Sequence, residues 1–162
     1  MKRFRLILMR HAQSVPLSPL MLDHKRHLDP QGIADAPSTA EKIKKSGFMP
    51  DYVFCSDAVR TQETWNLCEP TLGRGIPVLK THALYRARLE DLLGLIETTP
   101  SSVHTVMMVA HNPTLEITGE WMLGNTVVME PADALLLEIQ ADSWSSAAHQ
   151  KGNWKQIAHL IP

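Results

Sequence analysis

The stretch Leu6-Ile7-Leu8-Met9-Arg10-His11-Ala12-Gln13-Ser14 decides the fold, because an apolar strand leads directly into a positively charged pair. Four consecutive apolar residues near the start of the chain are typical of a strand that is covered on both faces. Arg10 and His11 follow where this strand ends, and open α/β folds bind ligands at the carboxyl ends of their strands. A guanidinium can hold two oxygens of a phosphoryl group, and an imidazole nitrogen can attack its phosphorus.

The composition limits the class of protein. With 162 residues, one domain with a real core is expected, and 44% hydrophobic and 20% charged residues are ordinary for a globular chain. The net charge of −1 argues against a nucleic-acid partner, and no apolar stretch approaches membrane-spanning length. The basic start precedes an apolar run too short for a signal peptide, so the expected location is the cytoplasm. Cys55 and Cys68 are expected to be buried free thiols of a reducing compartment.

Strand-like and helix-like segments alternate along the chain, which predicts an α/β fold with a mostly parallel sheet. The expected strands are residues 4–9, 52–55, 76–79, 105–109, 134–139 and 154–160, and the expected helices are residues 31–45, 58–69, 89–97 and 114–123. Pro77 favours an edge position for the third strand. Pro70 is expected to end the second helix, and residues 140–153 are expected to be a polar surface connection.

Three predicted strands end in residues that suit one phosphate site. Besides Arg10 and His11, Ser56 ends the second strand, with Arg60 in the first turn of the following helix, and His111 follows the fourth strand. Because parallel strands share their carboxyl edge, these side chains are expected to converge. Two arginines and two histidines can bind phosphoryl oxygens and supply one nitrogen nucleophile, which suits phosphoryl transfer. No cluster with metal-ligand spacing accompanies them, so no metal or other cofactor is expected.

Four blocks of the chain resemble the histidine phosphatase superfamily (phosphoglycerate mutase-like), and within it the small SixA-type phosphohistidine phosphatases. Arg10-His11-Ala12 stands where the family has Arg-His-Gly, and residues 28–37 resemble the segment after the family's first loop. Residues 50–64 resemble its Ser-x-x-x-Arg region, although Glu63 splits the Gln-Thr pair. Residues 109–115 are similar to its Gly-His-Asn-Pro block, with alanine in place of glycine.

This resemblance covers nearly the whole chain, and it implies a single histidine phosphatase domain over residues 1–162. The implied fold is a three-layer α/β sandwich with a mostly parallel central sheet flanked by helices. No cap domain is expected, because the chain is too short for the long insertions of the larger members.

The resemblance also implies roles for particular residues. His11, in its neutral form, attacks phosphorus in line and carries a transient phosphohistidine that water hydrolyses. Arg10, Arg60 and His111 bind the phosphoryl oxygens, and His111 is useful in its charged form. Ser14 stands where many members have a small hydroxyl residue, so a supporting phosphate-binding role is expected for it.

The identity of a general acid stays open. Phosphomonoesterase members usually place a glutamate after the third strand, whereas this chain has Tyr85 there, and Glu90 is the alternative carboxylate. SixA-type members share the lack of a clear acid. Because a protonated phosphoramidate nitrogen is a good leaving group, the missing acid favours P–N over P–O substrates.

Several functions follow in order of preference. The first is a phosphatase that hydrolyses phosphohistidine on a protein, such as a phosphotransfer or phosphocarrier domain, for which an open site without a cap is suited. The second is a phosphomonoesterase of broader specificity for small molecules. The third is a non-catalytic module that binds a phosphorylated ligand, and a metallohydrolase is a remote fourth. No membrane partner is expected, and a monomer is the simplest oligomeric state.

Other polar residues have less specific interpretations. Lys25 and Arg26 either contact phosphate from their loop or belong to an exposed basic loop, and both interpretations stay open. The remaining histidines share no common spacing and are expected to be surface or structural residues: His24, His27, His82, His104, His149 and His159.

Overall fold

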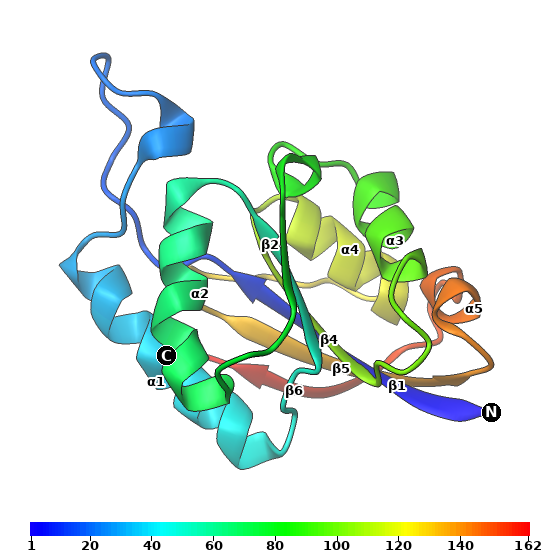
Figure 1. Ribbon diagram of the computed structural model, residues 1–162. Helices are drawn as coiled ribbons and strands as arrows, with labels where there is room; N and C mark the ends of the chain where they lie inside the picture. Colours follow the sequence, from blue (N-terminus) through cyan, green and yellow to red (C-terminus); the bar gives the residue numbers. More distant parts are fainter.

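The apolar run near the start of the chain forms an inner strand of a six-stranded sheet in a computed structural model of residues 1–162 (Figure 1). The strands lie in the order β3-β2-β4-β1-β5-β6; β1 to β4 are mutually parallel, whereas β5 is antiparallel to both of its neighbours. Their bounds are β1 (Lys2–Arg10), β2 (Tyr52–Ser56), β3 (Val78–Thr81), β4 (Thr105–Ala110), β5 (Ala134–Ala141) and β6 (Lys155–Leu160). All six expected strands are therefore present, and β3 lies at an edge.

Helices cover both faces of this sheet, α1 and α2 on one side and α3, α4 and α5 on the other (Figure 1). Their bounds are α1 (Pro30–Ser46), α2 (Val59–Leu72), α3 (Leu89–Glu97), α4 (Thr114–Leu123) and α5 (Trp144–Ala148), with short 3-10 turns η1 (Asp23–Lys25) and η2 (His82–Leu84). The expected three-layer, mostly parallel α/β fold is confirmed, and no cap domain is present. No helix combines the length and the apolar content that crossing a bilayer requires.

Strand β1 shows why both faces must be covered. Leu6 and Leu8 pack into the core under α3, α4 and α5, whereas Ile7 and Met9 pack into the core under α1 and α2. All four side chains are fully buried. Successive strand residues point to opposite faces, so an unbroken apolar run requires an apolar layer on each side.

Both cysteines are free and buried, as expected, in the layer between the sheet and the α1–α2 pair. Burial raises the pKa of the Cys55 and Cys68 thiols to about 12. Neither is a thiolate near neutral pH, so neither is poised as a nucleophile.

Two expectations about individual elements are wrong. Helix α2 continues past Pro70 to Leu72. A proline inside a helix removes one backbone hydrogen bond, and Pro70 lies in the last turn, where the helix ends soon afterwards in any case. The expected polar connection over residues 140–153 contains α5, and Trp144 at its start is buried against Phe4, with ring centroids 4.7 Å apart. The apolar part of this segment is too short to show a helical period in the sequence.

The start of α1 holds the segment that follows β1. Asp29 caps the helix by accepting from the Gly32 backbone N–H at 2.8 Å, and its own N–H donates to the Gln13 carbonyl at 3.0 Å. A Cβ at Gly32 would lie 2.1 Å from that same carbonyl oxygen. Only glycine permits this approach, which positions the chain directly after His11.

Gly32→Ala is expected to lower the free energy of unfolding by about 1–3 kcal/mol, because the added methyl group collides with backbone rather than with a movable side chain. The measurement is urea unfolding followed by circular dichroism. Gly94→Ala in α3 is the matched control, since its Cβ would meet nothing within 4 Å and alanine favours a helix. Equal effects of the two substitutions would contradict the close approach.

Candidate active site

The carboxyl ends of three adjacent strands bring the expected site residues together. Strands β2, β4 and β1 are neighbours in the sheet, and they lead into Ser56, His111 and His11. The rings of His11 and His111 lie with centroids 5.3 Å apart. Arg60, in the first turn of α2, directs its Nε to within 3.3 Å of the His11 Nε2. The predicted convergence is therefore present in the structure.

The ring of His11 is held in one tautomer by its two neighbours. Nδ1 lies 2.7 Å from the Ala12 carbonyl oxygen, which can only accept, so Nδ1 carries the proton. Nε2 accepts from the Arg60 Nε–H. The lone pair of Nε2 therefore faces the guanidinium, on the side where an anion would be bound.

Burial, together with the charges of Arg60, Arg10 and Arg26, lowers the pKa of His11 to about 4, although the bond to the Ala12 carbonyl opposes this shift. The ring is consequently neutral throughout the range near pH 7. A neutral imidazole is the form that can act as a nucleophile.

The pKa of His11 is expected to lie near 4, below that of an unperturbed histidine. The direction of this pKa shift follows from the environment. Burial and nearby positive charges oppose protonation, so the ring becomes charged only at a lower pH. Histidine NMR of the wild type and of His11→Asn identifies the resonance and its midpoint. A midpoint near 6.5 would contradict the buried, positively charged environment.

His111 is also neutral in the protein by itself, whereas its expected role uses the charged form. Burial and the nearby His11 and Arg60 lower its pKa to about 3. Its Nε2 lies 2.8 Å from the Ser56 hydroxyl, and its buried Nδ1 has no hydrogen-bond partner in the protein. When the Ser56 hydroxyl donates, Nδ1 carries the proton and is a free donor. The charged form would require an added anion such as a phosphoryl dianion beside the ring.

Arg60 is buried and is held by an aspartate that the sequence analysis did not single out. Its NH1 donates to the Asp23 backbone carbonyl at 2.8 Å, and its NH2 lies 3.1 Å from the Asp23 carboxylate. The same carboxylate accepts from the Tyr85 hydroxyl at 2.6 Å and pairs with Arg26 at 2.9 Å. Burial raises the pKa of Asp23, but these hydrogen bonds and charges outweigh it and hold that pKa well below its usual range.

The remaining expected residues lie around this core. Arg10 NH1 donates to the Met129 carbonyl at 3.0 Å, and its buried Nε has no hydrogen-bond partner in the protein. Ser14 accepts from Arg26 at 3.0 Å, so it reaches the site through that arginine. Lys25 is exposed. The Arg10 Nε–H is an unpartnered buried donor, and so is the His111 Nδ1 in the tautomer whose Nε2 accepts from Ser56. Such donors suit an anion site.

A pocket of about 390 Å³ opens beside these side chains. It is lined by Asp23, Arg60, Tyr85, Arg86, Ala87, His111, Asn112, Pro113 and Thr114. Neither His11 nor Arg10 is part of this lining. His11 contacts two residues that are, Arg60 and His111. Glu90, the alternative acid of the sequence analysis, is exposed at the start of α3 and does not line the pocket.

Asp23 was not predicted as a site residue, because the loop before it has no periodic pattern. One local signal was available: Asp23 and Arg26 are three residues apart, a spacing at which opposite charges pair on one turn. Nothing in the sequence indicates that Asp23 also reaches Arg60 and Tyr85, which lie 37 and 62 residues away.

The structure also contains one group of side chains able to hold a metal ion: His24, Asp57 and His82. It lies beside the pocket and outside its lining. No metal-binding cluster was expected from the sequence, because residues this far apart along the chain show no metal-ligand spacing.

Comparison with known proteins supports a specific family. No family model matches the chain. An uncharacterised chloroplastic protein of Arabidopsis thaliana is 30% identical over 98% of this chain and 78% of its own length. A 2,3-bisphosphoglycerate-dependent phosphoglycerate mutase of Bradyrhizobium diazoefficiens is 37% identical over 56% of this chain and 45% of that enzyme. A solved structure described as a candidate phosphohistidine phosphatase SixA of Agrobacterium tumefaciens superposes with a TM-score of 0.82 and 27% identity, covering 98% of each chain.

The structural likeness agrees with the α/β fold described above. The sequence match to a phosphoglycerate mutase and the structural match to SixA lead to the same superfamily. The SixA likeness further supports a phosphatase within it. The chain therefore belongs to the histidine phosphatase superfamily.

Proposed function

We propose that this protein hydrolyses phosphohistidine on a partner protein through a covalent intermediate at His11. Arg10, Arg60 and His111 bind the phosphoryl oxygens, and Ser14 supports them through Arg26. The partner is a phosphotransfer or phosphocarrier domain. The reaction needs no metal in this scheme.

The observation that carries the proposal is the absence of a usable carboxylic acid in the pocket. Asp23 is the only carboxylate in the lining, and its low pKa keeps it ionised. Burial and the Asp23 carboxylate raise the pKa of Tyr85 above its ordinary value, so it is a poor proton donor. An alkoxide leaving group needs a proton from the enzyme. The ring of phosphohistidine can already be protonated, and it then departs as neutral imidazole without a proton from the enzyme.

Each step uses an atom whose position is defined. The His11 Nε2 lone pair forms a bond to phosphorus while the bond from phosphorus to the partner's imidazole nitrogen breaks. The partner leaves as neutral imidazole, and the enzyme holds the phosphoryl group on Nε2. Water then attacks phosphorus, which releases inorganic phosphate and restores His11. The three cationic or N–H donor groups stabilise the charge on the oxygens during both transfers.

A loop beside the pocket supports a protein substrate. The segment between β1 and η1 extends beyond the helical layers (Figure 1), and it exposes Leu17, Leu20 and Leu22 by 59%, 99% and 71%. Asp23 follows this segment directly and lines the pocket. Exposed apolar side chains at this position can bury surface against a protein that presents its phosphorylated residue to His11.

The test compares phosphate release from three substrates: a histidine-phosphorylated phosphocarrier protein, phosphoramidate and an aryl phosphate ester. We expect both P–N substrates to be preferred over the ester. The double variant Leu20→Ser with Leu22→Ser is expected to raise KM for the protein substrate only. Preference for the ester would favour the small-molecule phosphomonoesterase, and phosphate binding without turnover would favour the non-catalytic binding module.

Location and oligomeric state remain part of this proposal. We place the protein in the cytoplasm, as the two free thiols favour a reducing compartment. We propose a monomer acting as a single domain over residues 1–162, because one sheet joins both ends of the chain.

A further inference from the structure

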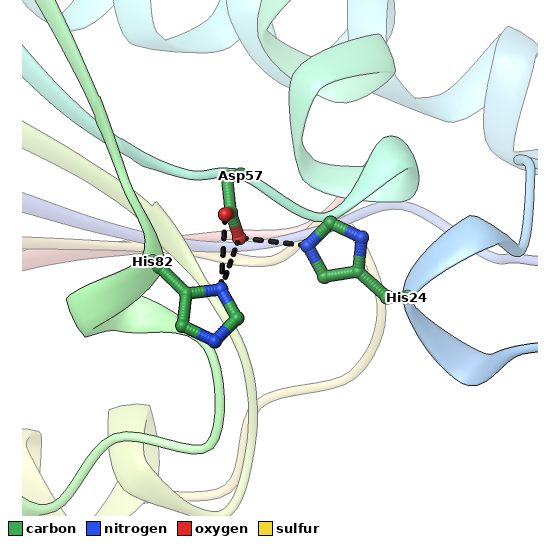
Figure 2. Close-up of side chains that lie close together, drawn as sticks. All are labelled: His24, Asp57 and His82. Carbon is green, nitrogen blue, oxygen red and sulfur yellow. Dashed lines mark hydrogen bonds and ion pairs between the residues drawn. The ribbon is translucent and has the colours of Figure 1, made fainter.

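His24, Asp57 and His82 form a compact group of potential ligands outside the phosphate pocket (Figure 2). The His24 Nε2 lies 2.8 Å from Asp57 Oδ1, and the His82 Nδ1 lies 2.9 Å from Asp57 Oδ2. All three ligand atoms lie within 4.8 Å of one another. Figure 2 shows the two imidazoles directed at the same carboxylate from opposite segments of the chain.

The geometry points to a zinc-binding site formed by these three residues, which we propose as a site additional to the phosphatase reaction. Two imidazole nitrogens and one carboxylate are ligands that zinc accepts, whereas magnesium and calcium prefer oxygen ligands alone. Three protein ligands leave one tetrahedral position for water.

The spacing requires little movement to hold the ion. Zinc bonds of about 2.0–2.1 Å at tetrahedral angles place ligand atoms roughly 3.3 Å apart. With Asp57 Oδ1 as the single carboxylate ligand atom, its distances to the His24 Nε2 and the His82 Nδ1 are 2.8 Å and 3.2 Å, so each would widen by about 0.5 Å or less. His82 is able to make this adjustment, because its side chain is 73% exposed.

The carboxylate is also in the protonation state that a ligand requires. Burial raises the pKa of Asp57, but the hydrogen bonds with His24 and His82 outweigh it and the net shift is downward. Asp57 is therefore ionised at neutral pH. A metal ion would take the place of the protons that the two imidazoles now direct at this carboxylate.

The position of the group gives the site a consequence for the pocket. His24 follows Asp23, Asp57 follows Ser56, and His82 lies three residues before Tyr85. Each of these neighbours contacts a site residue: Asp23 holds Arg60, Ser56 bonds to His111, and Tyr85 bonds to Asp23. A bound ion would thus connect η1, the end of β2 and η2, three segments that adjoin residues of the site.

The experiment measures metal binding rather than turnover, so it is independent of the proposed phosphatase activity. Zn²⁺ is titrated calorimetrically into the purified, metal-free full chain, and Co²⁺ is used as a spectroscopic substitute whose visible absorption reports four-coordinate ligation. The variants are His82→Ala and Asp57→Asn. His104→Ala is the matched control for an exposed histidine, and His11→Asn removes the imidazole of the phosphate site.

We expect the wild type, His104→Ala and His11→Asn to bind about one equivalent of Zn²⁺ with the same affinity. His82→Ala and Asp57→Asn should bind at least about 10-fold more weakly and lose the Co²⁺ absorption. Zn²⁺ should also raise the Tm of the wild type and not that of His82→Ala. The proposal is overturned if wild type and both ligand variants bind alike, or if only His11→Asn loses the ion.

Discussion

Replacing His11 with asparagine is expected to reduce phosphate release at least about 1,000-fold, because the substitution removes the nucleophile and leaves only binding and charge stabilisation. The His11 Nε2 has its lone pair directed at the Arg60 Nε–H, and its ring is neutral near pH 7, which is the form that can attack phosphorus. Steady-state rates on phosphoramidate give the size of the effect. Trapping with a phosphorus-labelled substrate should show a phosphorylated wild type and no phosphorylated variant.

Two controls make this result interpretable. His104→Asn changes an exposed histidine outside the site and should keep wild-type activity. Circular dichroism should show that His11→Asn is folded, since asparagine fills less of the site without adding a charge. Substantial turnover by a folded His11→Asn protein would exclude the covalent mechanism. A phosphoryl label found on His111 of the wild type, and not on His11, would assign the role of nucleophile to His111.

Replacing Arg60 with alanine is expected to lower kcat/KM by about 100- to 1,000-fold, which is the usual effect of removing one donor from a site where charge develops. The residue is buried, and its Nε is directed at the atom that would carry the phosphoryl group. Arg60→Lys keeps the charge but loses the planar fork, so it should recover only part of the activity. Inorganic phosphate should inhibit both variants more weakly than the wild type.

The fold of Arg60→Ala needs a separate check, because Asp23 loses one of its partners. Asp23 keeps Arg26 and the Tyr85 hydroxyl, so the loop should stay in place and the Tm should change little. A large fall in Tm together with the loss of activity would assign Arg60 a structural role. Wild-type kcat/KM in Arg60→Ala would remove it from the phosphate site altogether.

The local pattern of apolar and polar residues was sufficient to predict much of the architecture. Unbroken apolar runs such as residues 6–9 predict strands buried on both faces, because a strand with one exposed face would alternate. The alternation with helical segments then predicts a parallel sheet, whose topology brings His11, Ser56 and His111 to one edge. For this reason the sequence alone predicts that these residues lie close together.

Elements that depend on contacts between distant segments were harder to predict. Trp144 at the start of α5 is buried against Phe4, at the other end of the sequence, and its Nε1–H donates to the Val103 carbonyl oxygen. Asp23 gave a local signal through Arg26 but none for its contacts with Arg60 and Tyr85. Such contacts join loops whose residues have no hydrophobic periodicity. The sheet positions these loops, and so determines which of their residues meet.

The sequence by itself determined the α/β class and the resemblance to the histidine phosphatases. It also predicted the strand ends that lead to Arg10, His11 and His111, and the helix start that carries Arg60. It could do so because hydrophobic period and strand-end chemistry are local properties of the chain. Only the tertiary structure decided the tautomer and low pKa of His11, the ion-paired state of Asp23, and the meeting of His24, Asp57 and His82. Those properties depend on interatomic distances and on burial. Both arise when segments that are distant in the sequence pack together, so the spacing of residues along the chain does not reveal them.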